Sequence, residues 1–221
     1  MTIRLLLALA LALLTAGCAE ARPCRAGQTC PVLILFDGDS VAAGNGASTT
    51  RPEQLLRETL PMPVSVANTA APGRPVRECL EQFDRDVVLR PAARNISLIV
   101  FHAGDNDIAQ GRDAETTYRY FAAYVERAHR DGWKVLVSTE LPRPDFSAEM
   151  AAQLQAYNHL LLANGAGADA VFDLAADPRL NDPAGRAASG LYADGAHPND
   201  AGYRRLNALL TAAARPLLSA R

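Results

Sequence analysis

The sequence predicts an α/β fold built on a parallel sheet, and three observations support this prediction. Short apolar runs recur along the chain and are continuous rather than alternating, which is typical of strands covered on both faces. Segments with helical periodicity lie between these runs, and strands that alternate with helices favour parallel pairing through right-handed crossovers. Polar segments follow the first three apolar runs. Because the carboxyl ends of parallel strands meet at one edge, we expect these segments to form a ligand site there.

The expected elements follow in order along the chain. Five strands are predicted over residues 32–36, 64–66, 98–101, 135–137 and 170–172. Five helices are predicted over residues 52–60, 76–88, 114–130, 148–163 and 201–218. The sequence has no repeat and no low-complexity linker, so residues 31–221 are expected to form one domain. A chain of 221 residues with 49% hydrophobic content is long enough for one full core.

Residues 1–21 have the composition of an export signal. Arg4 precedes an apolar stretch over residues 5–14 that is too short to span a bilayer. Two processing signals follow: "LTAGC" resembles a bacterial lipobox ending at Cys18, and "AEA" is an ordinary cleavage site after Ala21. We favour lipidation of Cys18. Both signals predict export from a bacterial host, with membrane contact only through a possible lipid anchor.

Three further cysteines and the formal net charge bear on disulfides, metal sites and nucleic-acid binding. Export makes a disulfide chemically reasonable, and Cys24–Cys30 is the short local choice, whereas Cys79 lies in a predicted helix and is expected to be unpaired. The alternative is that these cysteines are small buried residues without a bridge. No Cys/His spacing indicates a zinc site, and we expect no metal or cofactor. The formal net charge of −2 gives no reason to expect nucleic acid.

The polar segments contain the residue types that a serine hydrolase needs. Ser40, in "GDSVAAG", stands where the first strand turns into a helix, so that backbone amides point at incoming negative charge. Asp194 and His197, in "DGAHPN", are close enough for one loop to present both side chains. Asp194 would orient the imidazole, and His197 would serve Ser40 as a base. Gly73 can bring a backbone N–H close to the substrate, and Asn106 offers an uncharged amide donor.

These segments resemble the conserved blocks of the GDSL/SGNH hydrolase family, in that family's order. "GDSVAAG" is similar to its first block, "NTAAPG" to its glycine block, "GDND" to its G-x-N-D block and "DGAHPN" to its D-x-x-H block. The resemblance implies that Ser40 is the nucleophile, His197 the base and Asp194 the orienting acid. It also implies an oxyanion hole formed by the N–H groups of Ser40 and Gly73 and the side chain of Asn106.

The same resemblance implies a three-layer sandwich with a flavodoxin-like five-stranded parallel sheet in the order 2-1-3-4-5. Compact lysophospholipase/thioesterase-like and carbohydrate-esterase members are the most similar. The expected substrate is therefore a small-molecule, lipid or glycan ester, and the sequence does not indicate an oligomeric state. The chain departs from the family at Ala70, where a glycine is common, and at Arg74 and Pro75, where small polar residues are usual. These departures leave the path of the Gly73 loop open.

For two other polar residues of these segments, the sequence predicts a structural role rather than a catalytic one. His102 ends the third predicted strand and is the only rival base. We expect it to be packed and hydrogen-bonded, without an acid placed as Asp194 is for His197. Asp39 is expected to fix its loop by accepting backbone N–H groups.

Two alternative functions have some support from the sequence. "LILFDGDSV" also fits the first motif of haloacid-dehalogenase-like phosphatases, in which Asp37 would be the nucleophile, Asp39 the acid/base and Mg²⁺ the phosphate counterion. The motif order argues against this, because "GDND" and the only lysine, Lys134, precede the strand end "VLVST". The other alternative is a non-catalytic envelope lipoprotein that binds glycan, for which only the export signal argues.

Overall fold

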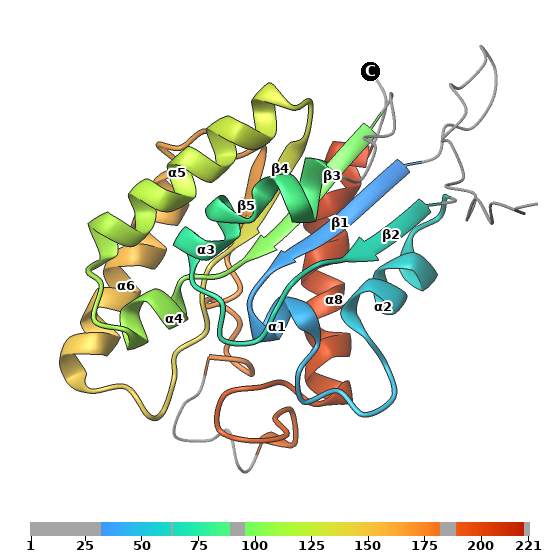
Figure 1. Ribbon diagram of the computed structural model, residues 1–221. Helices are drawn as coiled ribbons and strands as arrows, with labels where there is room; N and C mark the ends of the chain where they lie inside the picture. The colour runs from blue at the N-terminus through green and yellow to red at the C-terminus, as the bar shows by residue number, and fades with distance from the viewer. Residues whose placement is uncertain (1–31, 63, 89–95, 182–188, 219–221) are drawn as a thin grey trace, which may run out of the picture.

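The computed structural model describes residues 32–62, 64–88, 96–181 and 189–218. Within these ranges one sheet has five parallel strands in the order β2-β1-β3-β4-β5 (Figure 1). The strands are β1 Val32–Gly38, β2 Val64–Asn68, β3 Ile96–His102, β4 Lys134–Ser138 and β5 Ala170–Phe172. The predicted α/β class and the sheet order are confirmed. Four strands are longer than predicted, because flanking residues continue the backbone pairing beyond the predicted apolar run.

Seven α-helices surround the sheet in the described residues. They are α1 Ser40–Ala43, α2 Pro52–Thr59, α3 Val76–Glu81, α4 Asp105–Ala109, α5 Ala114–Arg130, α6 Ala148–Ala163 and α8 Asp200–Ala214. The bounds of α5 and α6 match the prediction, whereas α4 was not predicted and the helix expected after the Ser40 turn, here α1, was predicted without bounds. The helix expected over residues 76–88 is wrong in part, since α3 ends at Glu81 and a π-helical turn follows over Asp84–Val88. The last predicted helix likewise ends in a 3₁₀ turn, Arg215–Leu218.

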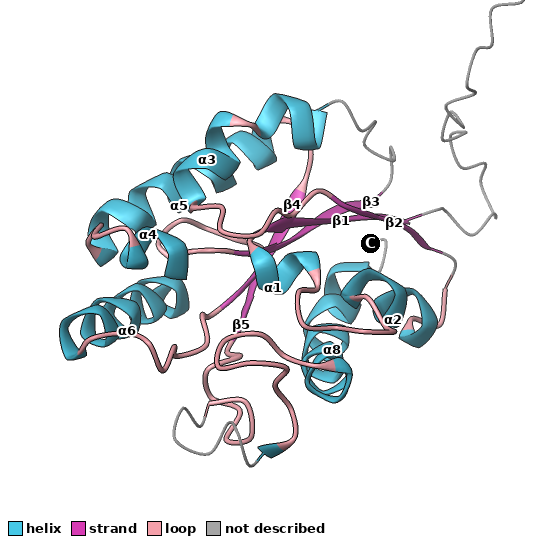
Figure 2. Ribbon diagram, turned by 60° about the horizontal axis from the view of Figure 1, so that its bottom comes forward, coloured by secondary structure: helices cyan, strands magenta, loops and turns pink. Residues whose placement is uncertain are grey.

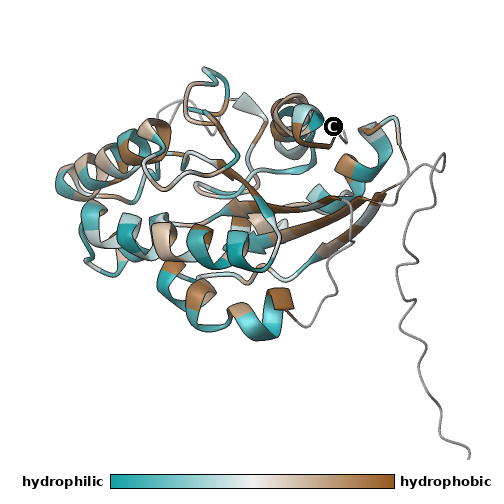
Figure 3. Cartoon of the chain, turned by 90° about the horizontal axis from the view of Figure 1, so that it is seen from above, coloured by the Kyte–Doolittle hydropathy of each residue, from teal (hydrophilic) through white to brown (hydrophobic). Residues whose placement is uncertain are grey.

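The helices cover the two faces of the sheet. Figures 1 and 2 show α3, α5 and α6 on one face and α2 and α8 on the other. Successive residues of a strand point to opposite faces, so each strand supplies both apolar layers. One layer includes Ile34, Leu98 and Leu136, and the other includes Leu35, Ile99 and Val135. The strands are accordingly apolar over most of their length in Figure 3, while the helices carry mixed surfaces.

Backbone hydrogen bonds join the loops that follow β1, β2 and β3. The N–H of Asp39 donates to the carbonyl of His102 at 2.9 Å, and the N–H of Thr69 donates to the carbonyl of Phe36 at 2.9 Å. The N–H of Ala71 donates to the carbonyl of Gly38 at 3.0 Å. Strand order reverses around β1, and ligands bind at such a point in open parallel sheets. The three polar segments therefore lie together at the edge where a site was predicted.

Candidate active site

The turn that carries Ser40 is held against the end of β3. β1 ends at Gly38, whose φ is 134°, and a Cβ there would lie 1.9 Å from the carbonyl oxygen of His102. Only glycine fits this close approach. Asp39 then caps α1, because its Oδ1 accepts the N–H of Val41 at 2.9 Å. The expectation that Asp39 fixes its loop is confirmed, and Ser40 becomes the first residue of the helix.

Asp194 and His197 lie on one tight loop before α8. Oδ1 of Asp194 accepts the N–H groups of Ala196 and His197, each at 2.7 Å. Oδ2 of Asp194 lies 2.8 Å from Nδ1 of His197. Burial acts to raise the pKa of Asp194, but these hydrogen bonds from His197 and Ala196 outweigh it and lower the pKa to about 2. Asp194 is therefore a carboxylate that can hold a proton on Nδ1 of His197.

The other nitrogen of His197 faces Ser40. Nε2 of His197 lies 3.0 Å from Oγ of Ser40. With its proton on Nδ1, the ring presents a lone pair at Nε2 that can accept the hydroxyl proton. The structure thus brings together Ser40, His197 and Asp194 in one hydrogen-bonded line, as the sequence predicted.

A pocket of about 230 Å³ opens beside this line. Its lining residues are Ser40, Val41, Asn45, Pro72, Gly73, Asp105, Asn106, Arg143, Ala196 and His197. Nδ2 of Asn106 is buried without a hydrogen-bond partner, an arrangement that is rare in folded proteins and calls for an explanation. Gly73 has a φ of 75°, and a Cβ there would meet nothing within 4 Å. Both predicted donor positions, Gly73 and Asn106, therefore line the pocket that contains Ser40.

The Arg74 side chain holds the loop in which the sequence departs from the family pattern. Its side chain is buried and pairs with the carboxylates of Asp37 and Asp86. Its Nε donates to the carbonyl of Gly38 at 3.1 Å, and a terminal nitrogen donates to the carbonyl of Thr69 at 3.1 Å. A small polar residue could not reach these partners. Arg74 therefore ties the Gly73 loop to the end of β1.

Asp37, the nucleophile of the phosphatase alternative, is a structural residue. Its side chain is fully buried and accepts hydrogen bonds from Arg74, from the Tyr124 hydroxyl at 2.6 Å and from the N–H of Gly38 at 2.9 Å. It does not line the pocket of Ser40. A carboxylate enclosed in this way cannot attack a phosphate, so the phosphatase alternative is wrong for Asp37.

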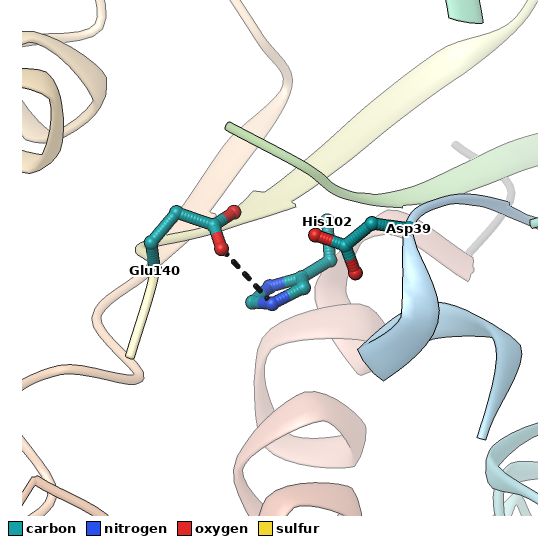
Figure 4. A group of neighbouring side chains, drawn as sticks. All are labelled: Asp39, His102 and Glu140. Atoms are coloured by element: carbon teal, nitrogen blue, oxygen red, sulfur yellow. Dashed lines mark ion pairs between the residues drawn. The ribbon is translucent and has the colours of Figure 1, made fainter. Parts of the chain in front are cut away.

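His102 is buried and hydrogen-bonded, as expected, but the expectation that it lacks a well-placed acid is wrong. Its Nδ1 lies 2.5 Å from Oγ of Ser138, and its Nε2 lies 3.1 Å from a carboxylate oxygen of Glu140, as Figure 4 shows. Burial lowers the pKa of His102 to about 4. His102 does not line the pocket of Ser40 and is bonded at both nitrogens, so it is not placed to act as a base there.

Several residues of this region were not predicted from the sequence. Arg143 lines the pocket and pairs with Asp105 at 3.2 Å and with Asp145 at 2.7 Å. Glu140 is buried beside His102. Asp105 stands inside the "GDND" segment and could have been singled out by that position, whereas no local pattern distinguishes Arg143 or Glu140 from surface residues.

One group of side chains has the composition of a metal site. Asp39, His102 and Glu140 each offer one ligand atom, and these atoms lie within 4.8 Å of one another. All three side chains are buried.

The remaining predictions concern the cysteines and the N-terminus. Cys79 is buried and unpaired, as expected. Cys18, Cys24, Cys30 and the export signal lie outside the described residues. Among the helices that the structure describes, none has the length and apolar character to cross a membrane.

Several solved structures have a similar fold. A G-D-S-L family lipolytic protein from Veillonella parvula has a TM-score of 0.67 and 21% identity, over 84% of this chain and 97% of that chain. The lipase/acylhydrolase from Enterococcus faecalis has a TM-score of 0.63 and 21% identity, over 86% of this chain and 98% of that chain. An acetyl xylan esterase has a TM-score of 0.63 and 21% identity, over 82% of this chain and 98% of that chain.

A search of curated protein sequences finds no significant match. The model of the GDSL-like lipase/acylhydrolase family matches residues 36–205, which include Ser40, Asn106 and His197. This match spans most of the chain and agrees with the fold and the sheet order. The chain is therefore an enzyme of the GDSL-like lipase/acylhydrolase family.

Proposed function

We propose that the protein is a serine esterase that acts through an acyl-enzyme on Ser40. The observation that carries this proposal is the hydrogen-bonded line from Ser40 through His197 to Asp194, which opens on a pocket with an unpartnered buried donor on Asn106. In the first step Nε2 of His197 takes the Ser40 proton as Oγ attacks the ester carbonyl. Asp194 stabilises the imidazolium that forms, and His197 then protonates the leaving alcohol.

Hydrolysis of the acyl-enzyme repeats these steps with water. His197 removes a proton from the water, which attacks the acyl carbonyl, and then returns a proton to Oγ of Ser40. In both halves negative charge develops on the carbonyl oxygen. The N–H groups of Ser40 and Gly73 and Nδ2 of Asn106 are the proposed donors to this oxyanion. Nδ2 of Asn106 has no protein partner in the resting site, so it can donate to the oxyanion without first breaking another hydrogen bond.

The size of the pocket favours a short acyl group. Its volume of about 230 Å³ is below the range of roughly 300–1,000 Å³ that is usual for drug-sized ligands. Arg143, Asp105 and Asn106 also make part of its wall polar. We therefore propose acetyl or other short-chain esters of carbohydrates or small molecules as substrates, ahead of long-chain lipids. Across p-nitrophenyl esters from acetate to palmitate, kcat/KM should be highest at the short end, and a maximum at palmitate would contradict this proposal.

The reaction class has a direct test. A fluorophosphonate probe should label the wild-type protein on the peptide that contains Ser40 and should not label Ser40→Ala. Because Oγ is the nucleophile, Ser40→Ala should also lose nearly all of kcat while it keeps its folded circular-dichroism spectrum. Activity that is abolished by a chelator and restored by Mg²⁺, without probe labelling, would contradict a serine esterase.

We also propose that the protein is exported and lipidated on Cys18, on the basis of the signal in its first residues. The bacterial protein should then partition into a detergent phase, and Cys18→Ser should release it to the aqueous phase. A mature protein that begins at Arg22 would instead support ordinary cleavage after Ala21.

A further inference from the structure

The segment between α1 and α2, residues 44–50, packs against the loop that carries His197. Figure 1 shows this 44–50 segment beside the start of α8. Gly46 has a φ of 87°, and a Cβ there would lie 2.5 Å from the carbonyl oxygen of Pro198 and 3.0 Å from the Cβ of His197. Only glycine fits such a close approach. The chain that follows the Ser40 helix is therefore in direct contact with the loop of the proposed base.

Asp200 binds the 44–50 segment with both of its carboxylate oxygens. Its Oδ1 accepts the N–H groups of Ser48, Thr49 and Thr50, at 3.0, 3.1 and 3.2 Å. Its Oδ2 accepts the hydroxyl groups of Ser48 and Thr49, at 2.6 and 2.8 Å. Between 150 and 152 positions separate Asp200 from these donors in the chain. One side chain thus joins two distant parts of the sequence beside the candidate active site.

Asp200 is the first residue of α8 and follows His197 by three positions. It is not the cap of this helix, because Oδ1 of Asn199 accepts the N–H groups of Ala201 and Gly202, at 2.9 and 3.1 Å. The Asp200 carboxylate can therefore bind the 44–50 segment without leaving its own helix uncapped. The hydrogen bonds from Ser48 and Thr49 hold the pKa of Asp200 below its ordinary value, so the group is ionised at neutral pH.

The end of the 44–50 segment has little burial to hold it in place. Ser48 and Thr49 are exposed, and the side chains of the segment are small or polar. Ala47 packs against the core, and the backbone carbonyl of Asn45 lies 2.9 Å from the Tyr203 hydroxyl. These two contacts fix the first half of the segment. The second half is attached to α8 through Asp200.

We propose that Asp200 is a positioning residue for the pair formed by Ser40 and His197. Its carboxylate fixes the segment that packs against His197, and this holds Nε2 of His197 at 3.0 Å from Oγ of Ser40. Asp200 is not among the described residues that line the pocket of Ser40, so it acts through other residues rather than on the substrate. The consequence for catalysis rests on the proposed esterase function, whereas the attachment of the 44–50 segment does not.

Asp194 and Asp200 have different roles in this arrangement. Asp194 contacts the His197 ring within one loop, at 2.8 Å, and so sets the orientation of the ring. Asp200 bonds to a separate segment and so sets where the whole loop lies relative to Ser40. A misplacement of about 1 Å between reacting groups costs on the order of 100-fold in rate. Loss of Asp200 should therefore lower kcat rather than weaken substrate binding.

Steady-state kinetics of Asp200 variants on p-nitrophenyl acetate tests the proposal. Asp200→Ala removes all of the bonds to the 44–50 segment and should lower kcat by about 10- to 100-fold, with KM within about twofold of the wild type. Asp200→Asn keeps an acceptor for the N–H groups, and its amide can donate to the hydroxyls. Its kcat should therefore lie between those of the wild type and Asp200→Ala. A folded Asp200→Ala with the kcat of the wild type would overturn the proposal.

Asp113→Ala is the matched control. Asp113 also accepts an N–H and a hydroxyl group near the start of a helix, both from Thr116, at 2.6 and 3.1 Å. It is exposed and caps α5, away from the Ser40 pocket. Asp113→Ala should lower Tm through the lost cap and leave kcat unchanged. A fall in kcat as large as that of Asp200→Ala would reduce the Asp200 effect to a general loss of stability and would overturn the proposal.

A second pair of variants tests the same contact without changing Asp200, and it also decides the matter if Asp200→Ala does not fold. Gly46→Ala places a methyl group against Pro198 and His197, so it should displace the His197 loop and lower kcat by at least about tenfold. Gly132 is the matched control, since its φ is 80° and a Cβ there would meet nothing within 4 Å. Gly132→Ala should keep the kcat of the wild type. Equal kcat in the two variants would overturn the proposal.

Amide hydrogen exchange, followed by NMR on the full-length protein, separates this proposal from the esterase function. In Asp200→Ala the N–H groups of Ser48, Thr49 and Thr50 should exchange faster than in the wild type, because they lose their acceptor. Unchanged exchange at these three positions would overturn the proposal at any level of activity. Failure of the fluorophosphonate probe to label Ser40 would instead contradict the esterase function, and the exchange result would still stand.

Discussion

Nε2 of His197 lies 3.0 Å from Oγ of Ser40, although 157 positions separate the two residues in the chain. Contacts outside the pair bring them together. The Tyr203 hydroxyl, on α8, lies 3.0 Å from the carbonyl oxygen of Val41 and 2.9 Å from that of Asn45, and its one proton can be donated to either. The helix that follows the His197 loop is thereby bonded to the backbone around Ser40. The distance between base and hydroxyl is set by packing of the whole domain rather than by either loop.

The Asn106 side chain should act only when charge develops on the substrate. Asn106→Ala should lower kcat by roughly 10²–10³, about 3–4 kcal/mol, because one oxyanion donor is lost. KM should stay nearly unchanged, since the ground-state ester carbonyl needs this donor less than the oxyanion does. Steady-state kinetics on p-nitrophenyl acetate measures both values. A rise in KM at unchanged kcat would mean that Asn106 binds the ground state instead.

Replacing Asp194 should damage catalysis and alter the pH dependence of stability. Asp194→Asn should lower kcat by up to about 10⁴, because an amide favours the wrong tautomer of His197. The folded-state pKa of about 2 lies below the ordinary value of 3.8. Stability from the ionised Asp194 is therefore fully present above the ordinary value and is lost as pH falls through the folded value. The Tm difference between wild type and Asp194→Asn should shrink between these two pH values in calorimetry, and a difference that grows there would contradict the assignment.

The buried pair of Arg74 with Asp37 and Asp86 should be costly to break. Arg74→Met leaves two carboxylates without their cation and should reduce the free energy of unfolding by about 3–5 kcal/mol. Arg77 is the matched control, since it pairs with Glu81 at the surface of α3, at 46% side-chain exposure. Arg77→Met should cost only about 0–1 kcal/mol. Denaturant titration distinguishes the two, and equal small losses would show that the buried ion pair does not stabilise the fold.

Asp37→Asn separates the structural role of Asp37 from a chemical one. The change weakens the bonds with Arg74 and the Tyr124 hydroxyl, so the protein should lose stability, by about 1–3 kcal/mol. Ester hydrolysis should nevertheless persist, because Asp37 does not line the pocket of Ser40. The measurement is kcat on p-nitrophenyl acetate at a temperature where the variant is folded. A folded Asp37→Asn without activity, beside an active Ser40→Ala, would reverse the roles assigned here.

Tertiary contacts decided several features that no local pattern could predict. The helices α1 and α4 are too short to show a hydrophobic period, and α1 depends on the cap from Asp39. The π-helical turn after α3 places Asp86 at the buried Arg74. A charged residue in a loop is exposed in most proteins, so the sequence alone does not indicate that Glu140 is buried beside His102.

The sequence by itself determined the parallel α/β sheet and the candidate residues Ser40, Asp194 and His197. Continuous apolar runs indicate strands that are buried on both faces of a sheet. Only a few types of side chain can serve as nucleophile, base and orienting acid, so the candidates are few. Only the tertiary structure decided which polar atoms meet: Arg74 with Asp37, Glu140 with His102, and Arg143 with Asp105. These partners come from different elements, and their pairing depends on distances and on exclusion of water, which a linear pattern does not contain.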